Sequence, residues 1–435
     1  MGDITTQANA IIPDYNLMAL PKQFEESNTL FAELRKNTLK MKRGTQSHLF
    51  GVQMTKSEAN VTAPYASDDA TMPVYRDPVI EQVTVQPVYS YMTFTMYPTA
   101  ADSFQDGKSF IKNLLNFKLM NAQENTIARM GQVFLGGIAP GTHQGTGVIG
   151  LVNADPGTGT TITFDSRFGK TGIGSGMGVT PDDLFGEGMH IDFINPADGA
   201  VRSNTPSGGY RITAVDDVNH TLTIASAADA TIADNDYIVR YGEYNSGINP
   251  LMQLVSNTDG PTSVLGVSRS TYPKWMSTRI HNSGTGWAIS DALLGQLFTR
   301  VANRTGKQPK AGYRLVSREE TCDQIAAIAT GMQRLAPNEA KIGSNKPTFT
   351  YRGTEFSFLT DTHLAANRVW LLDFDDIGLL ELKPLEWYKL NGTYLHPVVA
   401  SATAAMLVRA VGYWRGNLYL KSRFRHGVLE DVIQA

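Results

Sequence analysis

The chain contains a single cysteine and no long apolar run. Cys322 has no second cysteine with which to form an intrachain disulfide, and one thiolate is too few for a cysteine-based metal site. The longest apolar run, residues 398–408, is far shorter than the ~20 residues that span a bilayer. The first fifteen residues have no basic segment followed by an apolar one, so no signal peptide is predicted. We therefore expect a soluble intracellular protein made in a reducing compartment.

Common catalytic motifs are also missing from the sequence. The eight histidines are scattered, without H-x-x-x-H or H-E-x-x-H spacing, and there is no G-x-S-x-G elbow and no G-x-x-x-x-G-K-[ST] loop. Gly145, Gly147 and Gly150 do form a G-x-G-x-x-G string. A dinucleotide site needs a strand before this string and a helix after it, whereas here a helix is predicted before it and turns after it. We interpret the string as a backbone turn and predict no cofactor, no metal and no enzymatic activity.

One acidic cluster is the best remaining candidate for chemistry. Asp373, Asp375 and Asp376 lie close together in the segment LLDFDDIGLL. The functional interpretation is a metal or acid–base site, and the structural one is a strand end followed by a turn. We favour the structural interpretation.

The cysteine and the tryptophans also have a structural interpretation. Cys322 lies beside Ile325 on an apolar helix face, which predicts a buried thiol rather than a nucleophile. Four tryptophans fall in strand-like or loop contexts and are expected in the core or at an interface: Trp275, Trp370, Trp387 and Trp414.

Charge is distributed unevenly along the chain. Residues 155–250 carry thirteen acidic and five basic side chains, a net charge of −8, which leaves +5 for the rest of a chain whose total is −3. Such a split indicates that two parts of the protein meet different surroundings, or simply that each has a solvated face. Two basic runs contain no acidic residue: Arg35, Lys36, Lys40, Lys42, Arg43 and Lys56, and then Arg409, Arg415, Lys421, Arg423 and Arg425.

The most regular segment is a long amphipathic helix over residues 107–136. Asp106 is suited to cap its start, and Gly136 with Gly137 ends it. Apolar residues recur at steps of three and four, which is the helical period. At about 1.5 Å per residue the helix would be about 40 Å long, so it can support other elements.

The segments before this helix predict an arm and a β-rich excursion. Residues 1–20 read as an extended arm, and Pro21 opens a short helix that runs to about residue 42. Residues 45–98 are rich in β-branched and aromatic residues, with a polar tip at 57–78. A two-stranded hairpin of this size is not stable alone in water, so we expect a neighbouring subunit to support it.

The segments after the helix predict two further units. Residues 155–250 are Gly-rich and contain five short strand signals, typical of a small β-barrel or sandwich inserted into a larger domain. Residues 262–395 read as mixed α/β, with a helix that begins after Ser290 and ends at Gly306. The end of the chain is again β in character.

Three stretches in this order resemble one protein family. They are residues 134–153 (FLGGIAPGTHQGTGVIGLVN), residues 312–382 (from GYRLVSREETCDQI to NRVWLLDFDDIGLLEL) and residues 412–431 (GYWRGNLYLKSRFRHGVLED). The sequence resembles the major capsid protein of tailed double-stranded-DNA bacteriophages, which has the α+β Hong Kong 97-like fold. The resemblance covers nearly all of the chain except the insert at about 155–250.

The resemblance implies a domain organisation. It assigns residues 1–44 to an N-terminal arm and short helix, 45–87 to an extended loop, 88–154 to a peripheral domain with its spine helix at 107–136, 155–250 to an inserted β-domain, 251–395 to an axial domain, and 396–435 to a return to the peripheral domain.

The resemblance also implies a function. The chain would self-assemble as hexamers and pentamers into an icosahedral shell in the virion, after synthesis in the bacterial cytoplasm. Its partners would be copies of itself, portal and scaffolding proteins, and packaged double-stranded DNA held without sequence specificity, with the insert a candidate site for a decoration protein. Some family members crosslink a lysine of the extended loop to a neighbour's asparagine, and Lys56 is the lysine that could be offered for this.

Two alternatives remain open at this level. An encapsulin-type compartment shares the fold but encloses protein cargo. A glycan-acting enzyme with a β accessory domain would need two carboxylates converging in a cleft, and Asp373 with Asp375 is the only pair to propose.

Overall fold

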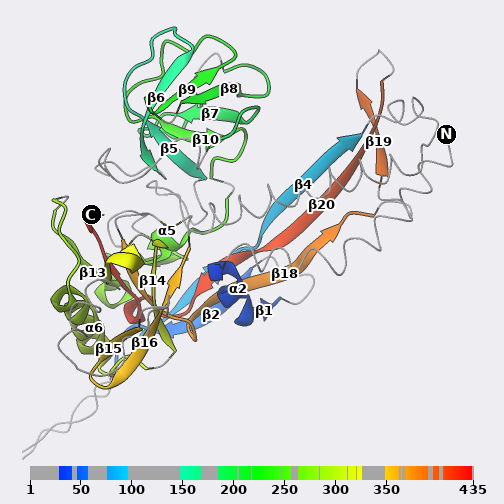
Figure 1. Cartoon of the computed structure of the whole chain (residues 1–435). Helices are drawn as coiled ribbons and strands as arrows, with labels where there is room; N and C mark the ends of the chain where they lie inside the picture. Colours follow the sequence, from blue (N-terminus) through cyan, green and yellow to red (C-terminus); the bar gives the residue numbers. More distant parts are fainter. Residues whose placement is uncertain are drawn as a thin grey trace, which may run out of the picture.

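The computed structural model places a six-stranded sheet, a long β-arm and a barrel as three recognisable parts (Figure 1). It describes residues 29–41, 47–56, 76–96, 147–167, 185–202, 205–216, 218–245, 247–255, 263–283, 285–310, 312–319, 321–325, 348–361, 364, 368–389, 395–400 and 405–433. The predicted long helix at 107–136 lies outside the described residues, as do most of the predicted N-terminal arm and the tip of the extended loop. In the described parts of the chain, no helix is both long and apolar enough to cross a membrane.

The six-stranded sheet combines segments that are far apart in the sequence. Its order is β13 (Thr278–Ile280), β21 (Gly427–Leu429), β17 (Val369–Asp373), β14 (Tyr313–Ser317), β16 (Thr354–Thr360) and β15 (Thr348–Tyr351). The last forty residues were predicted to return to the peripheral domain, but β21 belongs to this sheet instead. This strand lies between β13 and β17, and its three residues are all buried, because an uncharged Gly-Val-Leu segment fits the middle of a sheet.

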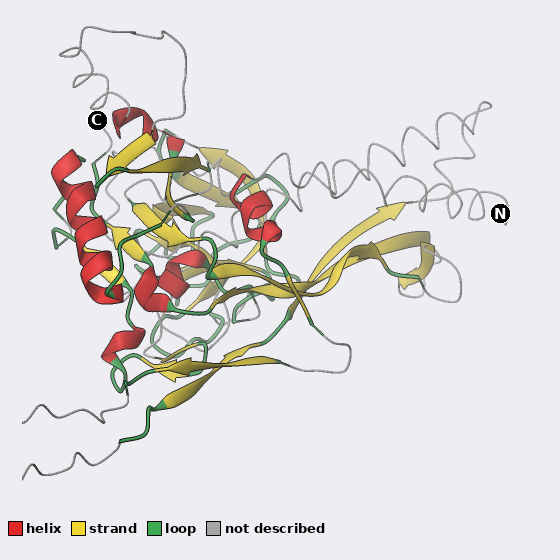
Figure 2. Ribbon diagram, turned by 90° about the horizontal axis from the view of Figure 1, so that it is seen from below, coloured by secondary structure: helices red, strands yellow, loops and turns green. Residues whose placement is uncertain are grey.

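Helix α6 (Asp291–Thr305) covers one side of this sheet (Figure 2). The hydroxyl of Ser290 accepts a hydrogen bond from the backbone N–H of Leu293 at 3.3 Å, and Gly306 ends the helix with a positive φ of 68°. Leu294, Leu297, Phe298 and Val301 form its buried stripe. The helix predicted between Ser290 and Gly306 is therefore confirmed.

The arm is built around one long strand, β20 (Ala405–Leu420). On one side β20 pairs with β4 (Val88–Met96), and on the other with β18 (Ile377–Trp387) and then β19 (Leu395–Ala400). These strands extend away from the six-stranded sheet (Figures 1 and 2). β18 was predicted inside the axial domain, but its long partner is β20, so the chain enters the arm at Ile377 rather than near residue 395.

Helix α2 (Thr29–Lys36) is shorter than expected. It was predicted to run to about residue 42, but it ends at Lys36, and β1 (Leu39–Lys40) follows and pairs in parallel with β18. The turn is held by Asn37, whose side-chain amide donates to the carbonyls of Phe374 (2.6 Å) and Ile377 (3.2 Å). These tertiary hydrogen bonds end the helix at a place where local helix propensity would allow it to continue.

The predicted two-stranded excursion is present as a hairpin. β2 (His48–Gln53) pairs antiparallel with β3 (Ile80–Val85) over their whole length. At its root the hairpin leans on the small β11 (Ser263–Val264) and β12 (Val267–Ser268) pair, where the N–H of Thr84 donates to the carbonyl of Leu265 at 2.9 Å. Val83 and Val85 are buried there, and Met54 is buried at the other end, whereas Leu49 and Ile80 are exposed.

Six strands close a barrel. Its order is β10 (Tyr237–Arg240), β5 (Val148–Val152), β6 (Thr161–Arg167), β9 (Thr221–Ile224), β8 (Tyr210–Asp216) and β7 (His190–Ile194). Five of these strands match the five strand signals of the sequence. The sixth, β5, was assigned to the preceding part of the chain, so the barrel begins at Val148 rather than at residue 155. α5 (Leu251–Val255) follows the barrel.

Candidate functional site

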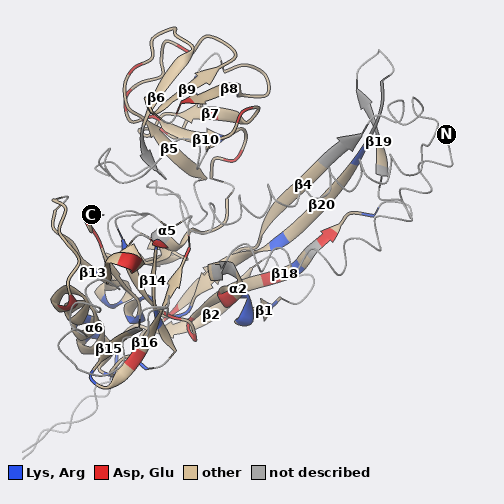
Figure 3. Ribbon diagram, viewed as in Figure 1, with Lys and Arg blue, Asp and Glu red and all other residues tan. Residues whose placement is uncertain are grey.

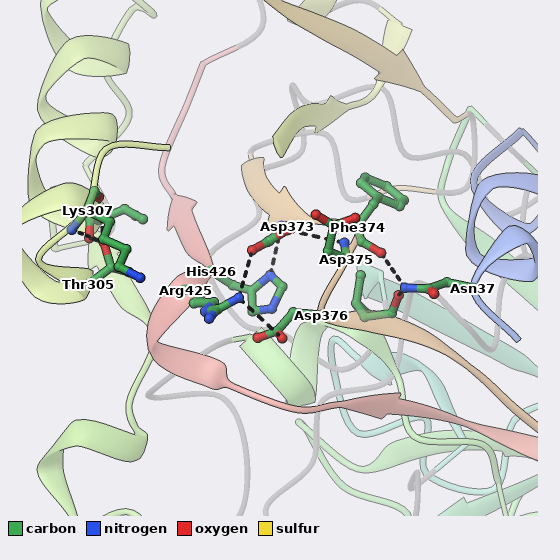
Figure 4. Close-up of polar contacts among 11 residues, drawn as sticks. Asn37, Thr305, Lys307, Asp373, Phe374, Asp375, Asp376, Arg425 and His426 are labelled. Carbon is green, nitrogen blue, oxygen red and sulfur yellow. Dashed lines mark hydrogen bonds and ion pairs between the residues drawn. The ribbon is translucent and has the colours of Figure 1, made fainter. Parts of the chain in front are cut away.

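Two segments that connect the six-stranded sheet with the arm lie side by side. One is the turn 374–376 between β17 and β18, and the other is the segment 421–426 between β20 and β21, which contains the short helix η3 (Arg423–Arg425). The backbone N–H of Lys421 donates to the carbonyl of Asp376 at 3.0 Å. We call this pair of connections the junction (Figure 4).

The junction contains two buried carboxylates and one cation between them. Nη1 of Arg425 lies 3.5 Å from Oδ2 of Asp373 and 3.6 Å from Oδ1 of Asp376. Only 5% of Asp373 and 6% of Asp376 is exposed. Burial raises the pKa of Asp376 to about 6, although Arg425 acts in the opposite direction, and burial also raises the pKa of Asp373.

His426 adds a neutral partner to this group. Its Nδ1 accepts a hydrogen bond from the backbone N–H of Asp373 at 3.2 Å, so the ring proton sits on Nε2. Burial, together with Arg423 and Arg425, lowers the pKa of His426 to about 3. The imidazole is therefore uncharged at neutral pH.

A third segment, helix α2 with Asn37 directly after it, is bonded to the same turn. Asn37 donates to the carbonyls of Phe374 and Ile377, as described above. Glu33 of α2 forms an ion pair with Arg314 of β14 at 3.0 Å, and the Arg314 guanidinium lies 5.5 Å from the centre of the Phe374 ring. Helix, sheet and arm are thus connected at one place.

The acidic cluster has the geometry of a structural turn. The N–H of Asp375 donates to Oδ1 of Asp373 at 3.2 Å, while Arg425 contacts the other oxygen of Asp373. Among the described residues, no group of three His, Cys, Asp or Glu side chains could hold a metal ion. Asp373 and Asp375 are close neighbours in one turn, an arrangement unlike two carboxylates on either side of a glycosidic bond. Of the sequence interpretations, this geometry supports the strand end and turn.

The C-terminal basic run does not form one solvated face. Arg423 is buried, and it donates to the carbonyls of Leu254 (2.5 Å) and Trp275 (3.1 Å), the latter in the short helix η2 (Pro273–Trp275). Burial lowers the pKa of Arg423 to about 9. Arg425 binds the junction carboxylates, and the Arg415 guanidinium stacks 4.5 Å from the centre of the Tyr89 ring. These charges serve internal contacts that a sequence pattern does not distinguish from surface charge.

Other residues singled out from the sequence are also placed by the structure. Cys322 is buried, and burial raises the pKa of its thiol to about 11, as expected for a structural cysteine. Trp275, Trp370, Trp387 and Trp414 are all buried, which confirms their assignment to the core.

The structure places one glycine of the G-x-G-x-x-G string and also Lys56. Gly150 lies in strand β5, where an added Cβ would come within 2.1 Å of the Phe164 ring, so the predicted turn is wrong at this glycine, which belongs to a packed strand. Gly145 lies outside the described residues. Lys56 follows β2 and is exposed. Its crosslinking role stays a prediction.

The acidic charge of the barrel is partly internal. Figure 3 shows acidic residues along its loops, and Asp155, Glu187, Asp198 and Asp234 are exposed. Asp192, Asp229 and Asp236 are buried instead, and Asp236 forms a two-point ion pair with Arg202 at 2.5 and 2.7 Å. The outer surface of the barrel is therefore less acidic than its sequence alone indicates.

The arm exposes an aromatic face. Tyr89 and Tyr91 of β4 stack in parallel, with ring centres 5.7 Å apart, and Tyr91 is 60% exposed. On β20, Tyr413 lies opposite Tyr91. The ammonium of Lys383 in β18 donates a hydrogen bond to the hydroxyl of Tyr413 at 2.6 Å. We call Tyr89, Tyr91, Tyr413 and Arg415 the tyrosine face. Exposed aromatic groups that are already ordered are typical of protein–protein contacts.

The hairpin exposes aliphatic side chains in the same way. Ile80 is 65% exposed, and Leu49 and Val79 are also exposed. We call these three residues the hairpin strip. A folded subunit gains nothing from leaving them in water, so they too are candidates for contact with another chain.

Comparison with known proteins identifies the fold. No family model and no curated protein matches the sequence. The structure is similar to the solved capsid asymmetric unit of cyanophage A-1(L), at 11% identity over 93% of each chain and a TM-score of 0.51. A looser similarity, with a TM-score of 0.44, is found to Mycobacterium phage Cain, at 10% identity over 94% of this chain and 92% of that one. Another, with a TM-score of 0.36, is found to an encapsulin complex from Synechococcus elongatus, at 11% identity over 93% of this chain and 87% of that one. The chain has the fold of a phage capsid protein, as the sequence resemblance implied.

Proposed function

We propose that this chain, with the fold of a phage capsid protein, is a structural subunit that self-assembles into a closed shell. In this proposal the subunits form hexamers and pentamers, and these build an icosahedral virion shell around double-stranded DNA. The observation that carries the proposal is the pair of exposed apolar surfaces, the hairpin strip and the tyrosine face.

The hairpin strip needs a partner for physical reasons. An isolated two-stranded hairpin is marginally stable in water, and although Met54, Val83 and Val85 of this hairpin are buried against the subunit, Leu49, Val79 and Ile80 remain exposed. Removing apolar surface from water contributes about 25 cal/mol for each Å². Docking of the strip on a neighbouring subunit would therefore stabilise both the hairpin and the assembly.

The tyrosine face suits the role of a second contact. Tyr89 and Tyr91 are held by stacking on each other, and Arg415 lies over Tyr89. Because these side chains are already ordered, little conformational entropy is lost when a partner covers them.

Proposed partners follow from the same role. Diffuse positive charge on the inner surface would contact DNA phosphates without reading sequence. Portal and scaffolding proteins would act during assembly, and the barrel, as a domain inserted into the capsid fold, would be the surface open to a decoration protein.

Two double variants test the hairpin strip and the tyrosine face separately. We expect Leu49→Ser/Ile80→Ser and Tyr89→Ser/Tyr91→Ser to give folded subunits that form no closed shells, as followed by circular dichroism, sedimentation velocity and negative-stain microscopy. Val218→Ser is the matched control, because Val218 is an 87% exposed aliphatic residue in the β8–β9 turn of the barrel. Normal shells from both double variants would overturn the proposed role of these surfaces.

The contents of the shells separate the two shell functions. Shells purified from cells that make the complete set of assembly proteins should contain double-stranded DNA, detected by nuclease-protected absorbance at 260 nm. A single co-purifying protein cargo with no nucleic acid would instead identify a cargo compartment of the encapsulin type.

A further inference from the structure

A pocket lies between the end of strand β2 and the end of helix α6. Its volume is about 380 Å³, which is within the range of pockets that hold small molecules. Residues 52–56 of the hairpin and residues 303–306 of α6 and its cap form two of its walls, and Lys274 and Trp275 of η2 with Phe424 of η3 complete it. We call this site the cationic pocket. Because several elements surround it, it can enclose a small ligand.

Three cations line the cationic pocket, each from a different segment. They are Lys56 after β2, Lys274 in η2 and Arg304 in α6, and all three are exposed. Among the described residues that line the pocket, none is acidic. Within the described ranges, none of the three cations forms an ion pair with a carboxylate. Glu81 of the adjacent strand β3 does not line the pocket, and its carboxylate accepts a hydrogen bond from the hydroxyl of Tyr272 at 2.5 Å.

The guanidinium of Arg304 is held in place without being neutralised. Its Nη2 donates to the carbonyl of Pro273 at 2.6 Å and its Nη1 to the carbonyl of Ser277 at 3.2 Å, and both acceptors are uncharged. Partial burial lowers the pKa of Arg304. Burial, together with the positive charges of Arg269 and Arg304, also lowers the pKa of Arg423. A bound anion would offset this repulsion between like charges.

The end of helix α6 does not cancel the positive charge. The C-terminal end of a helix carries a partial negative charge on its unpaired carbonyls. Here the hydroxyl of Thr305 donates to the carbonyl of Val301 at 2.9 Å, and the N–H of Gly306 donates to the carbonyl of Ala302 at 2.9 Å. Carbonyls of the last turn are therefore already bonded, and the three cations determine the charge of the pocket.

We propose that the cationic pocket binds a free, compact phosphate anion through Lys56, Lys274 and Arg304. Phosphate oxygens accept charge-assisted hydrogen bonds from lysine and arginine, and an anion with two or more negative charges suits three cations better than a single carboxylate does. A concave pocket of about 380 Å³ has room for such an anion but not for a DNA duplex. The site goes beyond the proposed function and does not depend on it.

A bound anion would connect the hairpin to the rest of the subunit. Lys56 belongs to the hairpin side of the pocket, whereas Lys274 and Arg304 belong to the opposite walls. A ligand that binds only when these walls are together stabilises that arrangement by mass action. Amide hydrogen exchange at the end of β2 should therefore slow when the anion is present.

Titration calorimetry with pyrophosphate tests the site on unassembled full-length subunits at low ionic strength. We expect one binding site per chain. Lys56→Gln/Lys274→Gln should weaken binding by about tenfold or more, because the loss of a charge-assisted hydrogen bond corresponds to about a power of ten in affinity. Both lysines are exposed, so this variant should fold like the parent, as followed by circular dichroism.

The matched control removes the same charge just outside the pocket. Lys307 and Lys310 follow α6 and are exposed, and neither lines the pocket, so Lys307→Gln/Lys310→Gln should bind pyrophosphate like the parent. Hydrogen exchange measured by mass spectrometry should show ligand-dependent protection of residues 52–56 in the parent and the control only. Absence of binding, or equal weakening in the two double variants, would overturn the proposal. Displacement of pyrophosphate by a short DNA duplex would overturn the assignment to a free anion.

Discussion

Asp376 shows how burial and pairing oppose each other in a single side chain. Arg425 favours the charged form of Asp376, but the loss of water around the buried carboxylate is the larger effect. The pKa of Asp376 therefore rises from 3.8 to about 6. Because the folded-state pKa is above the unfolded value, the charged group destabilises the fold above about pH 6. This penalty disappears as the pH falls below the unfolded value.

The first prediction follows from the direction of this pKa shift. Asp376→Asn removes the charge and keeps the shape, so its free energy of unfolding relative to the parent should be higher at about pH 7.5 than at about pH 4. One pKa unit corresponds to about 1.4 kcal/mol, so the change between these pH values should be on the order of 2–3 kcal/mol. Urea unfolding of parent and variant at both pH values measures it, with Asp375→Asn as the control. A relative stability that is constant with pH would refute the assigned cause.

Individual residues also show what a sequence cannot reveal. The cluster of Asp373, Asp375 and Asp376 was visible in the sequence, and its interpretation as a turn agrees with the observed geometry. Its partners Arg425 and His426 lie some fifty positions later, and no local pattern links them to it. Arg423 was grouped with surface cations, although the structure buries it against the carbonyl of Leu254.

At the scale of elements, local signals determined what could be predicted. Helix α6 has an N-cap, a helical stripe and a C-terminal glycine, and all three agree with the structure. The β8–β9 hairpin was likewise evident from alternation on both sides of a polar turn. In such segments local preference and tertiary packing favour the same conformation.

Other elements depend on contacts that the sequence does not encode locally. β21 has only three residues, too few for a periodic signal, and it is a strand because β13 and β17 flank it. β5 contains Gly150, which reads as a turn residue, yet the Phe164 ring occupies the space that a side chain would need. The end of α2 is set by Asn37 and its bonds to the β17–β18 turn.

The second prediction belongs to this scale and concerns the cap of α6. Ser290→Ala removes the acceptor for the N–H of Leu293, and a lost cap costs about 1 kcal/mol. The free energy of unfolding from urea titration should fall by about that amount. Ser290→Asn, which can still cap, should restore most of it. Equal losses in the two variants would show that packing around this position, rather than capping, is responsible.

At the scale of the whole molecule, the subunit combines a buried interior with exposed apolar surfaces. The six-stranded sheet forms one apolar core with α6, and a second apolar cluster includes residues of the barrel, the arm and the sheet, such as Phe193, Leu418 and Trp370. The arm and the hairpin instead expose ordered apolar side chains, the tyrosine face and the hairpin strip. Apolar surface of this kind is expected where another subunit completes the fold.

Self-assembly is tested by sedimentation velocity with negative-stain microscopy of the purified chain, alone and with a scaffolding protein. We expect closed shells, or rings of five and six subunits, together with little free subunit. A uniform monomer of 47.5 kDa under both conditions would contradict it.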